Sequence, residues 1–207
     1  MPAFAAYRDR VDDVAFVAAL LDDVAAKHAV DPARVFATGI SNGAIFSNFL
    51  ALKLSERIAA IAPVAGGLAA PLPAVLRPAR PVSFLGLNGT DDPLVPYEGG
   101  AVARTHGRVV GAEETARRWA QAEGCAASAI RDAPPVRPGA GCTIERSRWS
   151  GGRDGTEVVL YALRGGGHTW PGGPQYAPSR LVGTACREPD ATRVIWEFFR
   201  DHPRRTP

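Results

Sequence analysis

The sequence lacks the patterns that identify several common classes of protein. It has no Cys and His spacing of the zinc-binding type, no aromatic RNA-binding signature and no G-x-x-x-x-G-K-S/T loop for phosphates. Its arginines are spread along the chain, and the one basic cluster, Arg204-Arg205, is interpreted as a solvated chain end. We therefore expect no nucleic-acid partner.

Long apolar runs are also missing. No stretch is long and apolar enough to span a bilayer, so we expect no membrane partner. The first ten residues show no basic region followed by an apolar core, so no signal peptide is visible. The 207 residues carry a net charge of +3 and are 46% hydrophobic and 22% charged, which fits one globular domain over residues 1–207.

Cysteine is scarce, with three residues at Cys125, Cys142 and Cys186. Three are too few for a disulfide scaffold. A Cys125–Cys142 bridge would close a short loop and stabilise the fold by about 3 kcal/mol in the loop-entropy model. Free, partly buried thiols fit the sequence equally well, so the redox compartment stays open.

The chemically most informative stretch covers residues 38–44 and reads T-G-I-S-N-G-A. It follows an apolar, β-prone run and precedes a helix-compatible run, which is the context of a G-x-S-x-G nucleophile elbow. Gly39 and Gly43 lack Cβ atoms, which lets the backbone turn sharply. We predict that Ser41 is a nucleophile and that the backbone N–H of Asn42 binds the oxyanion. A Gly-Ser-Gly run in a glycine-rich chain also fits an ordinary loop.

Strand-like and helix-like segments alternate along the chain, which predicts an α/β fold with a mostly parallel sheet. The predicted strands cover residues 35–38, 58–64, 82–87, 143–150 and 156–163. The predicted helices cover residues 11–29, 44–54, 111–123 and 191–202. Residues 126–142, which are rich in Ala, Pro and Gly, are predicted to form a long loop.

Three predicted strands end in residues that can perform catalysis. Ser41 follows the first strand, Asp91 and Asp92 follow the third, and His168 follows the fifth. Active-site groups of open parallel α/β sheets lie beyond these carboxyl ends. The chain order Ser, Asp, His is the one expected of α/β-hydrolases. His168 is the best candidate for the base, although a hydrogen-bonded loop histidine also fits, and the residues alone do not separate Asp91 from Asp92.

Three motifs together resemble the esterase/poly(3-hydroxybutyrate) depolymerase family, which includes feruloyl and acetyl-xylan esterases. They are residues 39–43 (GISNG), 88–97 (NGTDDPLVPY) and 166–172 (GGHTWPG). The resemblance implies an α/β-hydrolase fold in which Ser41 is the nucleophile and His168 the base. Of the two aspartates it selects Asp92, which matches the acid position of the family's H-G-T-x-D-x-x-V-P-Y pattern.

The chain departs from the family pattern in several places. Asn88 stands where the family has a histidine. The cysteine that the family carries just before the last strand is missing, since residues 150–152 read S-G-G, so Cys125 lacks its usual partner and whether Cys142 replaces it stays open. The chain also opens almost directly on the helix before the elbow, whereas the family begins with several more strands, one of which leads to the second oxyanion donor. We therefore expect an N-terminally truncated hydrolase with an unpaired sheet edge.

These observations predict a serine esterase that acts through an acyl-enzyme on polyhydroxybutyrate-type polyesters or on feruloyl or acetyl esters. The expected partner is a small-molecule or polymeric ester, and the triad needs neither a metal nor an organic cofactor. Trp170 and Tyr97 are candidates to line the acyl pocket, although core or loop packing also fits both. The resemblance implies an extracellular or periplasmic location for a full-length relative and leaves the location of this chain open.

Two other functions fit the sequence. One is a catalytically impaired remnant of a hydrolase that serves as a binding or structural module, suggested by the short N-terminus and by Asn88. The other is a serine peptidase on the same fold, which would share the triad. No acidic or aromatic specificity feature favours peptides.

Overall fold

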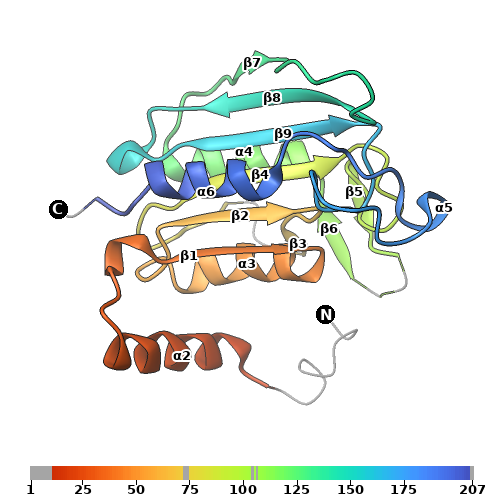
Figure 1. Ribbon diagram of the computed structural model, residues 1–207. Helices are drawn as coiled ribbons and strands as arrows, with labels where there is room; N and C mark the ends of the chain where they lie inside the picture. The colour runs from red at the N-terminus through yellow and green to blue at the C-terminus, as the bar shows by residue number, and fades with distance from the viewer. Residues whose placement is uncertain (1–10, 72–74, 104, 106, 206–207) are drawn as a thin grey trace.

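The computed structural model describes residues 11–71, 75–103, 105 and 107–205. Its centre is a six-stranded sheet in the order β1-β2-β4-β9-β8-β7 (Figure 1). Four neighbouring strands are parallel, namely β1 (Phe36–Ile40), β2 (Ala60–Val64), β4 (Ser83–Gly89) and β9 (Val158–Arg164). The last two, β8 (Thr143–Trp149) and β7 (Ile130–Asp132), are antiparallel. The carboxyl ends of β1, β2, β4 and β9 therefore meet at one edge of the sheet.

Helices cover both faces of the sheet, as Figure 1 shows. The strand residues alternate between the two faces: Ile61 and Phe84 pack with α3 (Asn42–Lys53) and α4 (Ala112–Glu123). Leu85 and Val159 instead pack with α6 (Ala191–Asp201). Because successive strand side chains point to opposite faces, the two-sided burial follows from these apolar runs. The predicted α/β-hydrolase fold with a mostly parallel sheet is confirmed.

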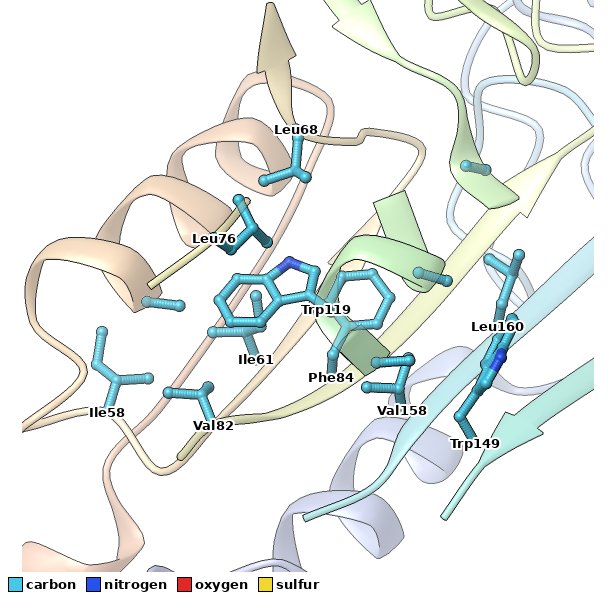
Figure 2. Close-up of a cluster of buried hydrophobic side chains, with 14 of the residues drawn as sticks. Ile58, Ile61, Leu68, Leu76, Val82, Phe84, Trp119, Trp149, Val158 and Leu160 are labelled. Carbon is cyan, nitrogen blue, oxygen red and sulfur yellow. The ribbon is translucent and has the colours of Figure 1, made fainter. Parts of the chain in front are cut away.

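Trp119 of α4 lies at the centre of the larger hydrophobic cluster (Figure 2). Its side chain is fully buried against Phe84, and its indole N–H donates to Asn48 Oδ1 of α3 at 2.9 Å. The hydrogen bond removes the cost of burying the indole nitrogen. Trp119 is therefore a core residue that joins α4 to α3 and β4.

Helix α2 (Asp13–Lys27) begins at the N-cap Asp12, whose carboxylate accepts from the Ala15 N–H at 2.9 Å. It contributes Val14 and Val17 to the edge of the larger cluster, whereas Phe16 on the same helix is 65% exposed. Within the part of the chain that the structure describes, β1 is the outermost strand and pairs only with β2.

The sequence missed the shortest elements. β7 lies inside residues 126–142, which were predicted to be a loop, and a second sheet combines β3 (Ala69–Ala70), β6 (Arg108–Val110) and β5 (Gly99–Ala101). The helix α5 (Ser179–Val182) was not expected either. Elements of two to four residues are too short to show a hydrophobic period, so only their tertiary partners define them.

Glu123 ends α4 and is fully buried. Its carboxylate accepts from the Val82 N–H at 3.1 Å and from Arg153 at 3.3 Å. Burial, only partly offset by these two contacts, raises the pKa of Glu123 from 4.5 to about 7. The folded state therefore holds a proton on Glu123 that the unfolded state releases at lower pH.

This raised pKa predicts a loss of stability as the pH rises. The contribution of Glu123 to the free energy of unfolding should be complete below pH 4.5 and should decline up to about pH 7, by at most about 3 kcal/mol. Urea unfolding across this range should show a flatter pH profile for Glu123→Gln. Glu114→Gln, on the exposed side of the same helix, should leave the slope unchanged, and an equal flattening in both variants would contradict the assignment.

Candidate active site

Ser41 occupies the sharp turn between β1 and α3, in a conformation that L residues rarely adopt. Its φ of 59° and ψ of −116° place it outside the regions that non-glycine residues favour. Its N–H donates to the Val64 carbonyl of β2 at 3.0 Å, which fixes the turn on the neighbouring strand. Strain of this kind concentrates at functional sites because the surrounding fold must hold it in place.

The side chain of Ser41 does not cap α3, although the residue occupies the N-cap position. It is the N-cap residue of α3, where a serine hydroxyl normally accepts from the helix backbone, yet its side chain makes no capping bond. Asn42 is the first residue of the helix, so its N–H has no carbonyl one turn earlier within the helix to donate to. The elbow thus presents a hydroxyl beside N–H groups at the positive end of a helix.

Gly39 allows the strand and the helix to approach each other. A Cβ at Gly39 would lie 2.8 Å from the carbonyl carbon of Gly43, whereas a Cβ at Gly43 would meet nothing within 4 Å. A Cβ at Gly66, which follows β2, would lie 2.9 Å from the Ser41 carbonyl oxygen. Close approach therefore requires glycine at positions 39 and 66, while position 43 has room for a side chain.

This difference predicts opposite outcomes for two alanine substitutions. Gly39→Ala should lower the free energy of unfolding by roughly 1–3 kcal/mol, since the new methyl group meets backbone atoms that cannot turn away. Gly43→Ala should leave it unchanged or raise it slightly, because alanine is the better helix former. Urea unfolding of the two variants measures both effects, and equal destabilisation would contradict this account of the elbow.

Asp92 and His168 form a buried pair at the same edge of the sheet as Ser41. The Nδ1 atom of His168 lies 2.7 Å from Oδ2 of Asp92, and the two side chains are 5% and 2% exposed. The other carboxylate oxygen of Asp92 accepts from the Leu94 and Val95 N–H groups, both at 2.8 Å. Asp91 instead receives a hydrogen bond from the Thr90 hydroxyl, so the structure brings Asp92 rather than Asp91 to the histidine.

Backbone contacts hold the loop that carries His168. Its N–H donates to the Val182 carbonyl at 2.6 Å, and the Gly167 N–H donates to Thr184 at 2.8 Å. A Cβ at Gly167 would lie 2.2 Å from the Val182 carbonyl oxygen, and one at Gly89 would lie 2.3 Å from that of Gly166. Gly89 at the end of β4 thus allows the loop after β9 to pack directly on it, and Gly167 allows that loop to approach the end of α5.

The three predicted triad residues lie beyond the carboxyl ends of β1, β4 and β9, but the hydrogen bonds of the described residues join only two of them. Among the hydrogen bonds of the described residues, none joins the Ser41 hydroxyl to His168. The aspartate and histidine are therefore paired, and the serine stands at the same sheet edge with its hydroxyl uncommitted. Catalytic hydrogen bonds commonly tighten only when substrate binds.

Tyr176 is a residue of this site that no sequence motif marked. Its hydroxyl donates to the backbone carbonyl of His168 at 2.9 Å, while the residue remains 58% exposed. Partial burial and the charge of Asp92 raise the pKa of Tyr176, which keeps it a hydrogen-bond donor. Gln175 fixes this segment through bonds to Gly183 and Ala185, at 2.9 and 2.7 Å. The only sequence signal was an aromatic residue close after the glycine-rich loop.

For the ester hydrolysis that the sequence predicts, we expect Tyr176→Phe to lower kcat about fivefold with little change in KM. The substitution removes one hydrogen bond to the His168 loop, worth about 1 kcal/mol, and keeps the exposed ring. Tyr161→Phe is the matched control, because its hydroxyl contacts Arg146 on β8 instead. Equal losses in both variants, measured by steady-state kinetics, would contradict a positioning role for Tyr176.

The two candidates for the acyl pocket lie in packed surroundings. Tyr97 is 5% exposed within the larger hydrophobic cluster, and its hydroxyl is buried without a partner in the described part of the chain. Trp170 packs against the cluster under α6, and its indole N–H donates to Thr192 at 3.1 Å. Neither side chain makes a hydrogen bond to Asp92 or His168.

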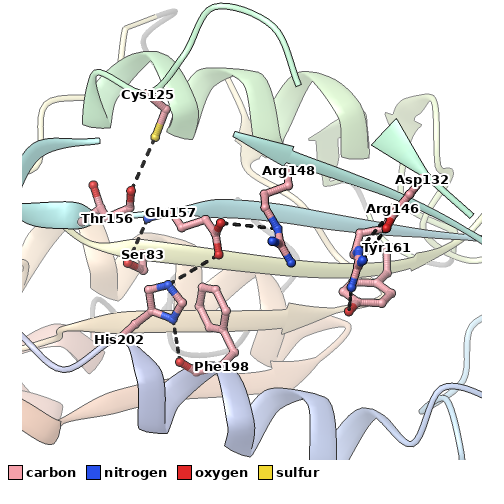
Figure 3. A network of polar contacts seen from close by, with 10 residues as sticks. All are labelled: Ser83, Cys125, Asp132, Arg146, Arg148, Thr156, Glu157, Tyr161, Phe198 and His202. Carbon is pink, nitrogen blue, oxygen red and sulfur yellow. Dashed lines mark hydrogen bonds and ion pairs between the residues drawn. The ribbon is translucent and has the colours of Figure 1, made fainter. Parts of the chain in front are cut away.

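The structure corrects the cysteine expectations. Cys142 is bonded to Cys186, a pair that the sequence analysis did not consider, and Cys125 is the free thiol. Burial raises the pKa of Cys125 to about 11, so it stays protonated, and its sulfur lies 4.0 Å from the Thr156 carbonyl (Figure 3). The Cys142–Cys186 bridge spans 44 residues, which corresponds to about 4 kcal/mol in the loop-entropy model. It ties the start of β8 to the segment that supports the His168 loop.

Comparison with curated proteins finds several esterases. The chain is 33% identical over 197 residues to "Putative esterase NocK" of Nocardia uniformis subsp. tsuyamanensis. The aligned residues cover 90% of this chain and 57% of that protein. It is 33% identical over 162 residues to feruloyl esterase B of Piromyces equi, covering 76% and 29% of the two chains. Feruloyl esterase C of Emericella nidulans is 30% identical over 188 residues, with coverages of 91% and 57%.

The chain thus spans little more than half the length of two of these relatives and less than a third of the other. No protein-family model matches it. Among the helices of the described residues, none is both long and apolar enough to cross a membrane.

Proposed function

Because this chain belongs to an esterase family with feruloyl esterases among its curated members, we propose that it is a serine esterase with Ser41, His168 and Asp92 as its triad. The observation that carries the proposal is the short contact between His168 Nδ1 and Asp92 Oδ2, at 2.7 Å, beside a strained serine elbow. The order Ser, Asp, His along the chain is that of α/β-hydrolases.

The chemistry follows from these positions. His168 accepts the proton of the Ser41 hydroxyl on Nε2 while Asp92 holds Nδ1–H and stabilises the imidazolium that forms. The Ser41 oxygen attacks the ester carbonyl, and the Asn42 N–H at the start of α3 stabilises the oxyanion of the tetrahedral intermediate. His168 then returns the proton to the leaving alcohol, and water attacks the acyl-enzyme by the same steps in reverse.

Two classes of substrate fit this proposal. The names of the relatives favour feruloyl esters, which carry an aromatic acyl group. The motifs shared with the depolymerase family favour polyhydroxybutyrate-type polyesters, and the acetyl-xylan esterases of that family add acetyl esters, whose acyl group is small and not aromatic. The exposed ring of Tyr176 beside His168 offers an aromatic surface at the site, which supports the aromatic acyl group.

A fluorophosphonate probe and a panel of esters test the proposal. We expect covalent labelling of Ser41 and turnover of p-nitrophenyl acetate. The rates with methyl ferulate and with a hydroxybutyrate oligomer, compared at equal concentration, show which of the two substrate classes the site prefers. Turnover of the corresponding amides should be far slower, and efficient amide turnover would favour the peptidase alternative. Absence of both labelling and turnover in the folded chain would overturn the esterase.

A second candidate is a hydrolase-derived binding or structural module with little catalytic power. This second function is favoured by the absence, within the described residues, of a hydrogen bond between the Ser41 hydroxyl and His168. Binding of an ester substrate without turnover, observed by calorimetry, would support this function. Measurable hydrolysis abolished by Ser41→Ala would exclude it.

A further inference from the structure

A second polar site lies at the other end of the sheet. A cavity of about 190 Å³ is bordered by residues at the amino ends of the parallel strands, among them Ala59 before β2, Ser83 at the start of β4 and Thr156 before β9. Because β4 contains seven residues, this cavity is roughly 20 Å from the edge that carries Asp92. It is therefore separate from the proposed catalytic site.

Three arginines line this cavity: Arg80, Arg204 and Arg205. Arg204 donates through Nη2 to the carbonyls of Ser55 and Ile58, at 2.6 and 2.8 Å. Its Nε and Nη1 atoms are buried and have no hydrogen-bond partner among the described residues. A buried donor on a charged group is costly to leave unpaired, so this guanidinium lacks an acceptor.

The other two arginines are uncompensated as well. Within the described residues, neither Arg80 nor Arg205 has a carboxylate oxygen within 4.0 Å. Burial lowers the pKa of Arg204, and the charge of Arg80 lowers it further against the opposing charge of Glu56. The cavity therefore concentrates positive charge from two separate parts of the chain.

The acidic side chains of the cavity do not cancel this charge. Asp201 already accepts from Arg200 at 2.8 and 3.1 Å, which leaves Asp154 as the one lining carboxylate without a cationic partner in the described structure. His202 is fixed by contacts to Glu157 and to the Phe198 carbonyl, so it forms a rigid wall (Figure 3). Three guanidinium groups thus face one uncommitted carboxylate.

We propose that this cavity is a binding site for a tetrahedral oxyanion of the phosphate class, held by Arg80, Arg204 and Arg205. Guanidinium groups bind such oxyanions through paired N–H donors, and the side chains of Arg80 and Arg205, which make no hydrogen bond among the described residues, supply these donors. Arg204, whose Nε and Nη1 atoms are buried and whose Nη2 is bonded to the carbonyls of Ser55 and Ile58, adds its positive charge to the site.

Titration of the full chain with inorganic phosphate tests this site. We expect saturable binding by calorimetry and a rise in Tm that chloride at equal ionic strength does not reproduce. Arg80→Gln and Arg205→Gln should each weaken phosphate binding about tenfold or more, since each removes a charge-assisted contact. These two side chains make no hydrogen bond within the described structure, so both variants should fold; Arg204 is left unchanged because it also supports Ser55 and Ile58.

Arg193→Gln is the matched control, because this arginine also lies on α6 but is paired with Glu197, and neither of these two residues lines the cavity. It should bind phosphate like the parent chain. A Tm rise equal to that in chloride, or equal affinities in all three variants, would overturn the proposal. The outcome is independent of the esterase assignment, because phosphate binding is measured without any ester.

Discussion

Replacing Ser41 by alanine is expected to reduce ester hydrolysis by about 10⁴-fold or more, because no other group in the proposed mechanism can form the acyl-enzyme. The same substitution should abolish labelling by a fluorophosphonate. The residual rate would come from substrate binding and from oxyanion stabilisation by the Asn42 N–H, neither of which needs the hydroxyl. Steady-state kinetics with a p-nitrophenyl ester measure the loss.

The fold should survive this change. The Ser41 side chain makes no hydrogen bond to the helix that it precedes, so removal of its oxygen leaves no buried partner unsatisfied. The strained φ of 59° is equally unfavourable for serine and alanine, so the free energy of unfolding should stay within about 0.5 kcal/mol. A serine retained for capping or packing would instead cost stability when replaced.

Ser47→Ala provides the matched control on the same helix. Its hydroxyl donates to the Gly43 carbonyl at 2.8 Å, so alanine there should cost about 1 kcal/mol of stability and leave kcat almost unchanged. The two variants should therefore show opposite patterns of activity and stability. Full activity in Ser41→Ala would remove the basis for a serine esterase.

The sequence predicts the features that neighbouring residues encode and misses those that depend on contacts between residues far apart in the chain. The elbow could be predicted because its turn, its close approach and its helix start are encoded within a few contiguous residues around Gly39 and Ser41. Gly43 belongs to the same pattern, yet the structure leaves open space at its Cβ. Its place in the motif therefore does not reflect crowding between the strand and the helix.

Long-range pairings escaped the sequence analysis because no local pattern specifies them. Cys142 and Cys186 are 44 residues apart and meet only because β8 and the segment after α5 are packed together. Tyr176 likewise reaches His168 because Gln175 turns its segment back on the loop. The choice between Asp91 and Asp92 depended on which of two adjacent side chains turns inward, and spacing along the chain does not determine that.

The clustering of arginines around the cavity also could not be predicted from the sequence. Arg204 and Arg205 looked like a solvated end in the sequence, yet Arg204 is anchored by its N–H to Ala33 and by its side chain to Ser55. Arg80 joins them from a connection more than a hundred residues away. Charge that is evenly spread along a chain can therefore be concentrated by folding, and composition alone does not reveal it.

Asp92→Asn is expected to lower kcat on the order of 10⁴-fold while leaving the local fold in place. Oδ1 of Asp92 accepts from the Leu94 and Val95 N–H groups, and the amide oxygen of asparagine can keep both bonds. The amide nitrogen then replaces Oδ2 beside His168 Nδ1. Because that nitrogen can only donate, it favours the tautomer with the proton on Nε2, where the base must accept.

Asp91→Asn separates this effect from a general change of charge at the site. Asp91 is the neighbouring residue, it is exposed, and among the described residues its carboxylate accepts a hydrogen bond from the Thr90 hydroxyl alone, so kcat should change by no more than about twofold. Thermal unfolding of both variants shows whether the loop is intact. If Asp92→Asn keeps nearly full activity in a stable fold, another group must orient His168, and the buried pair would then serve to anchor the loop. Such a result with Ser41→Ala still inactive would retain the serine nucleophile and discard only the aspartate from the proposed triad.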